Sequence, residues 1–122
     1  MCKILLSINP EHVDSIFSGI KKFEYRKVKC RRKIDSILIY STFPIMKVVG
    51  EVEVKDVLIG EPESIWEQTK KNSGIDKYFF ENYYKNRNKA VAFCLGSIDI
   101  FDHPKSLNDY GINNAPQSFV YI

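Results

Sequence analysis

Three charged side chains near the start of the chain have the types and the spacing to act on a phosphate or a carbonyl group. Lys21, Glu24 and Arg26 complete the pattern G-x-K-x-x-E-x-R over residues 19–26. Arginine holds a phosphate through two parallel hydrogen bonds, and a lysine becomes a nucleophile or a proton-transfer group when burial lowers its pKa. The carboxylate would orient the guanidinium or accept from a base amino group. The same pattern also suits a solvated strand, on which a Glu24–Arg26 pair contributes under ~1 kcal/mol.

The elements around this pattern determine where its side chains point. Gly19 predicts the end of a helix, because glycine takes the left-handed conformation without steric cost. The aromatic and β-branched residues that follow favour a strand, and side chains alternate between the faces of a strand. Glu24 and Arg26 therefore point the same way, together with Val28 and Cys30. We expect such a face, apolar at one end and charged at the other, at the mouth of a barrel.

Two further segments carry side chains suited to phosphate or base contacts. Five of the seven residues from 27 to 33 are basic. This segment is predicted as a hairpin that is either a solvated turn or a rim for phosphates, since lysine and arginine provide most of the sequence-independent attraction to nucleic acid. The rim residues would be Lys29, Arg31 and Arg32. Ser41 and Thr42 follow the next predicted strand, where hydroxyls contact a phosphate or a base edge, or bond their own backbone.

The composition predicts a globular protein and argues against several kinds of site. The chain has 122 residues, 44% of them hydrophobic, and a net charge of +3. This mildly basic balance permits a phosphate-bearing partner. The sequence has no glycine-rich phosphate loop, no cluster with metal-ligand spacing and only two histidines. We therefore expect no cofactor, no metal and no Ser-His-Asp triad.

The cysteines and the apolar segments bear on location. Cys2, Cys30 and Cys94 are scattered and odd in number, so they predict neither a disulfide framework nor a zinc site. No apolar run approaches the roughly 20 residues that span a bilayer, and no signal peptide is recognised at the start. We expect a cytoplasmic protein without a membrane partner, and the oligomeric state stays open.

The predicted elements follow the order β-α-β-β-β-α-α-β-β. This order is typical of an α+β domain in which one mostly antiparallel sheet bends into a small barrel covered by helices. Strands are predicted over 3–8, from 23 onward, and over 34–40, 47–59, 90–101 and 117–122, and helices over 9–19, 61–72 and 73–87. Gly50 interrupts the long strand, which indicates a bulge or a close backbone approach.

Helical spacing predicts which side chains of the helices are buried. His12 falls on the side of the first helix opposite its apolar stripe, so we expect it to be exposed. Trp66 is expected in the core, although stacking on a base is the alternative. In the third helix the aromatic residues are interpreted as core cover, with Phe79, Phe80 and Tyr83 packed inward.

The octet over residues 19–26 resembles the signature of ASCH domains, a family related to PUA-like RNA-binding domains. Other matching stretches are Leu5 to Pro10, Tyr40 to Pro44, Val49 to Val52 and Pro116 to Phe119. The resemblance covers essentially the whole chain. It implies a single ASCH domain over residues 1–122, with the PUA-like pseudo-barrel fold and about three covering helices.

The resemblance implies three alternative functions for one cleft. In the first, the domain binds RNA or a modified nucleotide. In the second, it is a small hydrolase, either an amidohydrolase acting on acylated nucleosides or a ribonuclease, in which Lys21 and Glu24 would be catalytic. In the third, it is an accessory factor of transcription or translation without catalysis. The amidohydrolases that it resembles carry a threonine three residues after the lysine, where this chain has Glu24.

The charge on Lys21 distinguishes a binding site from a catalytic one. A catalytic lysine must be partly neutral near pH 7, so its pKa must fall by about three units from roughly 10.4. Burial and a nearby Arg26 lower the pKa, whereas the Glu24 carboxylate raises it. The sequence favours a charged Lys21, which binds anions and does not attack carbonyls.

Overall fold

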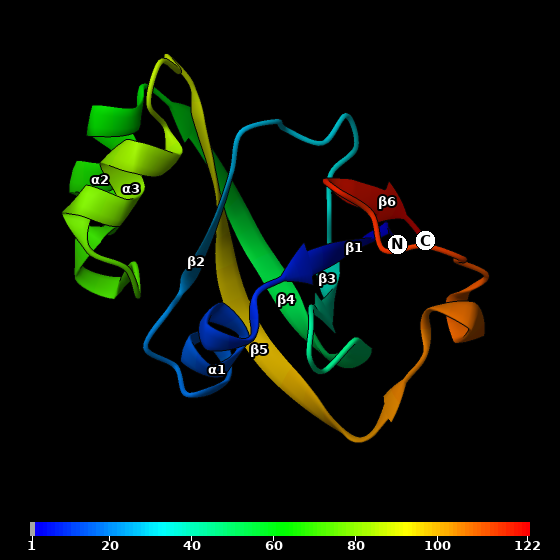
Figure 1. Ribbon diagram of the computed structural model, residues 1–122. Helices are drawn as coiled ribbons and strands as arrows, with labels where there is room; N and C mark the ends of the chain where they lie inside the picture. Colours follow the sequence, from blue (N-terminus) through cyan, green and yellow to red (C-terminus); the bar gives the residue numbers. More distant parts are fainter. Residues whose placement is uncertain (1) are drawn as a thin grey trace.

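The computed structural model describes residues 2–122, which form six strands, three α-helices and two short 3-10 helices (Figure 1). The strands are β1 (Lys3–Ile8), β2 (Phe23–Arg26), β3 (Ser36–Ser41), β4 (Lys47–Gly60), β5 (Ala90–Lys105) and β6 (Phe119–Tyr121). The helices are α1 (Pro10–Phe17), α2 (Pro62–Thr69), η1 (Lys70–Asn72), α3 (Lys77–Tyr83) and η2 (Leu107–Tyr110). Their order matches the predicted one.

All six strands belong to one mixed sheet in the order β2-β5-β4-β3-β1-β6. β1 and β3 are parallel, and every other neighbouring pair is antiparallel. β4 and β5 are long, at 14 and 16 residues, and their register shifts at three points. The sheet curls into a half-barrel (Figure 1), which confirms the predicted α+β fold with one bent, mostly antiparallel sheet.

Gly50 permits the curl at the point where α1 meets the sheet. The register of β4 against β5 shifts between Val48 and Gly50. A Cβ atom at Gly50 would lie 2.7 Å from both the Asp99 carbonyl oxygen and Cζ of Phe17. Only a glycine at position 50 lets the Phe17 ring of α1 and the backbone of β5 approach this closely. The predicted bulge and close approach are both present.

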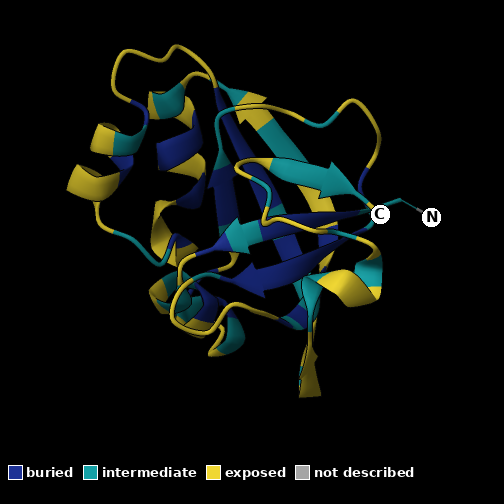
Figure 2. Ribbon diagram, turned by 45° about the vertical axis from the view of Figure 1, so that its right-hand side comes forward, coloured by how far each residue is buried: buried dark blue, intermediate teal, exposed yellow. Residues whose placement is uncertain are grey.

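The buried residues form three clusters that follow the two faces of the sheet. The inner face packs against α1 and includes Ile4, Leu6, Ile37, Val52 and Phe93. At one end the outer face is covered by α2 and α3, and at the other by the segment around η2. Figure 2 shows this pattern, with the middle of the sheet buried and the outer sides of the helices exposed. Trp66 lies in the core, as predicted, against Phe80.

Two local predictions were wrong: the length of the signature strand and the hairpin after it. Strands that follow one another in the sequence are not always neighbours in this sheet. β2 ends at Arg26, so Val28 and Cys30 do not continue its face. Residues 27–33 are not a hairpin: β2 pairs with β5, whereas β3 pairs with β1 and β4. The basic segment is therefore a crossover loop between two strands that are not neighbours in the sheet.

Candidate functional site

Lys21 is buried although it follows directly on an exposed helix end. After α1, Gly19 adopts φ +84°, and the backbone N–H of Lys21 donates to Ser15 O at 2.9 Å. The turn sends the lysine side chain inward, where only 4% of the residue is exposed. Its Nζ donates to Ser73 O at 3.2 Å and lies 4.7 Å from the centre of the Tyr25 ring. The helix end thus places an ammonium group inside the protein.

Glu24 and Arg26 form a tight pair on the inner face of β2. Nε and Nη2 of Arg26 donate to Oε2 of Glu24 at 3.0 and 2.8 Å, and Oε1 of Glu24 lies 4.0 Å from Nζ of Lys21. Nη2 of Arg26 also donates to Ser7 O on β1 at 3.0 Å. Three strands separate β2 from β1 in the sheet order. Arg26 therefore bridges the open side of the half-barrel.

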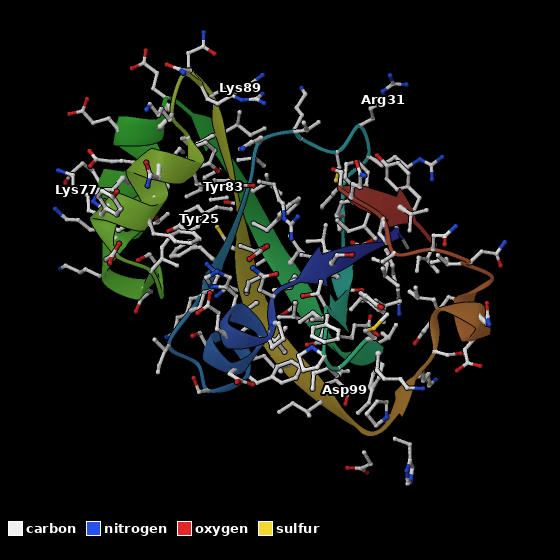
Figure 3. The ribbon with its side chains drawn as sticks, viewed as in Figure 1. Tyr25, Arg31, Lys77, Tyr83, Lys89 and Asp99 are labelled. Atoms are coloured by element: carbon white, nitrogen blue, oxygen red, sulfur yellow. The ribbon has the colours of Figure 1, made fainter. Side chains whose placement is uncertain are left out.

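These three side chains line one cavity of about 190 Å³, which we call the Lys21 cleft. Its walls come from the end of β1, from α1, from β2 and from α3. The lining residues are Ser7, Ile8, Asn9, His12, Lys21, Glu24, Tyr25, Arg26, Ile75, Phe79 and Tyr83. Figure 3 shows Tyr25 and Tyr83 in the region between β2 and α3. With His12 neutral, the cleft carries two cations and one carboxylate, so it suits an anion.

Burial lowers the pKa of two groups in the cleft. Desolvation lowers the pKa of Lys21 below its ordinary value; the Glu24 carboxylate opposes this, and the Arg26 cation adds to it. Glu24 was expected to keep Lys21 charged, but desolvation has the larger effect on the pKa of Lys21 in the structure. Burial, and next the Lys21 ammonium, also lower the pKa of His12. His12 is therefore more readily neutral than an exposed histidine.

The sequence analysis missed part of the cleft. His12 was expected to be exposed, but it is half-buried and its ring meets Phe79 edge-on, with 5.4 Å between the centroids. Phe79 was expected in the core, but it is 44% exposed and lines the cleft together with Tyr83. Asn9 at the start of α1 also lines it. His12 could have been identified from the side of α1 on which it lies, because that side faces the strand that carries Glu24 and Arg26.

Two predicted site residues, Ser41 and Thr42, do not line the cleft. Ser41 is buried at the end of β3, with 2% exposure. Oγ1 of Thr42 donates to Oδ1 of Asn9 at 3.2 Å, and its backbone N–H donates to Ile8 O at 3.0 Å. Thr42 therefore contacts Asn9, which lines the cleft, but neither the Ser41 nor the Thr42 hydroxyl reaches the Lys21 cleft itself.

The predicted phosphate rim lies at a second cavity. Lys29, Arg31 and Arg32 line a space of about 440 Å³ between the crossover loop and β4. None of them lines the Lys21 cleft. The signature residues and the rim residues thus form two separate surfaces, joined by the chain from Arg26 to Lys29.

Other kinds of site find no support in residues 2–122. This part of the chain has no group of three or more His, Cys, Asp or Glu side chains that could hold a metal ion. None of its helices is both long enough and apolar enough to cross a membrane.

The fold and the cleft define a class: a curled α+β half-barrel with a cationic cleft at the junction of β2, α1 and α3. The ASCH domain family profile matches residues 6–99. The chain belongs to the ASCH domain family. The crystal structure of ASCH from Zymomonas mobilis superposes with a TM-score of 0.89 and 23% identity, covering 98% of this chain and 87% of that one.

Several relatives of this chain are longer proteins, of which the chain matches only a part. "Large ribosomal subunit protein uL22" of Ureaplasma parvum is 32% identical over 120 residues, which are 98% of this chain and 39% of that protein. "ATP synthase subunit alpha" of the same organism is 26% identical, over 98% of this chain and 15% of that protein. An "ASCH domain-containing ribonuclease" of Zymomonas mobilis is 26% identical over 75% of this chain and 62% of that protein. The chain thus spans well under half of the first relatives it matches.

Proposed function

We propose that this chain is an RNA-binding ASCH domain that holds one nucleotide of its ligand in the Lys21 cleft. The observation that carries the proposal is the convergence of Lys21, Glu24 and Arg26 on one accessible cavity. The cavity is smaller than the roughly 300–1,000 Å³ of sites for drug-sized ligands. It accordingly suits one part of a larger ligand, such as a base or a phosphate group.

The charged groups suit a phosphate. Nη1 of Arg26 is not engaged in the hydrogen bonds that tie this residue to Glu24 and Ser7, which leaves donors for an anion. An ammonium group has three donors, and that of Lys21 has Ser73 O as its one partner within hydrogen-bond distance among the described residues. The oxygens of a phosphate in the cleft would accept hydrogen bonds from both side chains, and such bonds are strong because donor and acceptor are charged.

The aromatic wall suits a base. Phe79 and Tyr83 are four residues apart on α3, so they lie on one side of the helix, and both line the cleft. Unpaired bases stack on such rings with about 1–3 kcal/mol per base. Oxygen acceptors of Glu24 and Asn9 lie in the same cavity, where they would accept from an exocyclic amino group. This side of the cleft favours a single-stranded nucleotide over a free phosphate ion.

Lys21→Ala tests the proposal against a neighbouring lysine. Binding of fluorescently labelled single-stranded RNA, followed by anisotropy, should weaken at least about tenfold, equivalent to roughly 1.4 kcal/mol. Lys22→Ala removes the same charge from an exposed residue outside the cleft and should bind nearly as the wild type does. Circular dichroism verifies that both variants fold. Equal binding by the two variants would contradict the proposal.

The hydrolase alternatives are measured on the same proteins. We expect the wild type not to turn over acylated cytidines, because Glu24 replaces the threonine of the amidohydrolases that the chain resembles. Turnover that disappears in Lys21→Ala would identify the cleft as an amidohydrolase site and remove the binding proposal.

A second candidate function is RNA cleavage, and the position of His12 favours it. A neutral imidazole could take the proton of a ribose 2′-hydroxyl, whose oxygen then attacks the adjacent phosphorus. The bond from phosphorus to the 5′-oxygen breaks, that oxygen takes a proton from water, His12 returns its proton to the hydroxide that forms, and a 2′,3′-cyclic phosphate remains. Lys21 and Arg26 would stabilise the negative charge that develops on the phosphate. The relative named a ribonuclease supports this candidate.

The products of RNA incubation separate cleavage from binding. Electrophoresis of end-labelled RNA should reveal fragments that end in a cyclic phosphate if His12 and Lys21 act as described. His12→Ala and Lys21→Ala should then both remove the fragments. Intact RNA with the wild type, under conditions where it binds, would leave binding as the function.

A further inference from the structure

We propose that a single RNA strand leaves the Lys21 cleft over Lys27 and continues along a basic groove under the crossover loop. The inference rests on the proposed RNA binding and extends it from one nucleotide to a track of several. We define the basic groove as the second cavity, of about 440 Å³, between residues 29–34 and β4. The proposal joins it to the cleft as one binding surface.

The cations of the groove have no carboxylate partner within the part of the chain that the structure describes. Five cationic side chains line it, four from the loop and Lys55 from β4, against the single carboxylate of Asp56. Over residues 2–122 no carboxylate lies within 4.0 Å of any of these five cations. Figure 3 shows Arg31 directed away from the ribbon at the edge of the molecule. Cations that gather in this way without a carboxylate partner attract a polyanion.

Lys27 connects the groove to the cleft. Its ammonium lies 4.6 Å from the centre of the Tyr83 ring, and Tyr83 is itself a wall of the cleft. Arg26 lines the cleft and Lys29 lines the groove. Their Cα atoms are at most about 11 Å apart, since three residues of extended chain span no more. A strand that leaves the cleft therefore meets a cation on its way to the groove.

The floor of the groove favours unpaired bases over a duplex. Apolar residues also line the groove: Ile59 is 45% exposed and Val57 is half-buried, whereas Ile34 and Phe93 belong to the buried core. An apolar floor with a cationic rim matches a single strand, whose bases contact the floor while its phosphates meet the rim. A duplex keeps its bases stacked inside and would meet the rim alone.

The test compares RNAs of two lengths as the salt concentration varies. The probes are a labelled ribodinucleotide, which places one nucleotide in the cleft and is too short to follow the groove, and a labelled single strand of about 12 nucleotides. The wild type should bind the longer RNA more tightly and with a steeper salt dependence. In Arg31→Gln/Arg32→Gln the slope of log K against log salt should fall by about 1.4, since each phosphate contact on a single strand contributes roughly 0.7. Dinucleotide binding should not change.

A matched variant controls for net charge. Lys47→Gln/Lys71→Gln removes two charges from exposed residues outside both the cleft and the groove and should leave the slope unchanged. The track is wrong if the two double variants have the same slope, or if a duplex or polyglutamate binds the wild type as tightly as the single strand. If the wild type binds the dinucleotide and the longer RNA equally tightly, the proposed track is wrong but the proposed function still stands. Failure to bind either RNA overturns the proposed function as well.

Discussion

The Lys21 ammonium is held in an unusual position for a charged group. It is almost fully buried, yet its fixed partners are one carbonyl oxygen at 3.2 Å and a carboxylate oxygen at 4.0 Å. Buried charges are costly unless they are paired and fully hydrogen-bonded. This burial lowers the pKa of Lys21, which means that folding disfavours its charged form. Lys21 therefore lowers the free energy of unfolding at every pH at which it is charged in the unfolded chain. Such a position is typical of a binding or catalytic group.

His12 should make RNA binding depend on pH. Burial and the Lys21 cation hold its pKa below the ordinary 6.5 in the free protein, whereas a bound phosphate beside it would raise that pKa. Affinity should therefore increase several-fold as the pH falls from 7.5 to 5.5, when protonated His12 adds a third cation. The free protein should lose stability over the same range, because the unfolded chain takes up that proton more readily. Anisotropy and thermal melts at a series of pH values measure both effects.

The second histidine is the control for this prediction. His103 is exposed near the end of β5 and lines neither the cleft nor the groove. His12→Asn should remove the increase in affinity at low pH, and His103→Asn should keep it. A pH profile that His12→Asn leaves intact would assign the effect to another group and separate His12 from the ligand.

At the scale of elements, the cleft depends on how closely the η1–α3 connection approaches the helix-to-strand turn. Gly74 has φ +70°, and a Cβ atom on it would lie 2.5 Å from Cβ and 2.9 Å from Cα of Lys21. The neighbouring Ser73 supplies the carbonyl that receives the Lys21 hydrogen bond. The connection between η1 and α3 is therefore part of the site, although the charged residues of the site come from β2 and from the turn that precedes it.

Gly74→Ala should weaken RNA binding in addition to straining the backbone. The left-handed conformation costs a residue with a Cβ about 1–2 kcal/mol, and the clash would also displace Lys21. Gly111→Ala is the matched control, because Gly111 has φ +73° with nothing within 4 Å of the added atom. Both variants should lower the free energy of unfolding, and Gly74→Ala should also weaken RNA binding severalfold. Equal RNA affinities for the two variants would show that Lys21 tolerates the displacement.

The aromatic residues of α3 explain why part of the cleft could not be predicted from periodicity. Phe79 and Tyr83 form one apolar pair at a spacing of four, and Phe80 and Tyr84 form another, one residue further on. Either pair could have faced the core, because both have the helical spacing. In the structure Phe80 and Tyr84 are buried and the other pair borders the cleft. The helix type was evident from the sequence, but its rotation is set by tertiary packing on β2 and β5.

At the scale of the whole molecule, the sequence predicted the order of elements and the bent sheet, but not which strands meet. Alternation along β2 correctly placed Glu24 and Arg26 on one face. The hairpin over residues 27–33 was wrong because the chain there crosses from one edge of the sheet to an interior strand. Neighbours in sequence usually pair, and no local signal marks the exception. The bridge from Arg26 to β1 follows from the curl, which is a property of all the strands together.

The end of the chain and the basic loop are coupled across the molecule. β6 lies at the sheet edge beyond β1, and the hydroxyl oxygen of Tyr121 accepts the backbone N–H of Arg31 at 3.0 Å. The Arg32 guanidinium lies 4.4 Å from the centre of the same ring. Tyr121 is half-buried and also packs on the main core. One tyrosine thus joins the last strand, the core and the loop that borders the basic groove.

Tyr121 should therefore control the order of the loop, and graded substitutions separate its contributions. Tyr121→Phe removes one exposed hydrogen bond, worth about 0.5–1.5 kcal/mol at most, and keeps the ring beneath Arg32. Tyr121→Ala also removes the ring and its packing, and should lower the free energy of unfolding by about 2 kcal/mol. Backbone hydrogen exchange over residues 29–33 should accelerate slightly in the first variant and strongly in the second. Tyr78→Ala, at a tyrosine that is 74% exposed on α3, should leave that exchange unchanged. If exchange in the loop does not respond to Tyr121→Ala, the loop is held by its own contacts with β4, and the last strand serves only to cover the edge of the sheet.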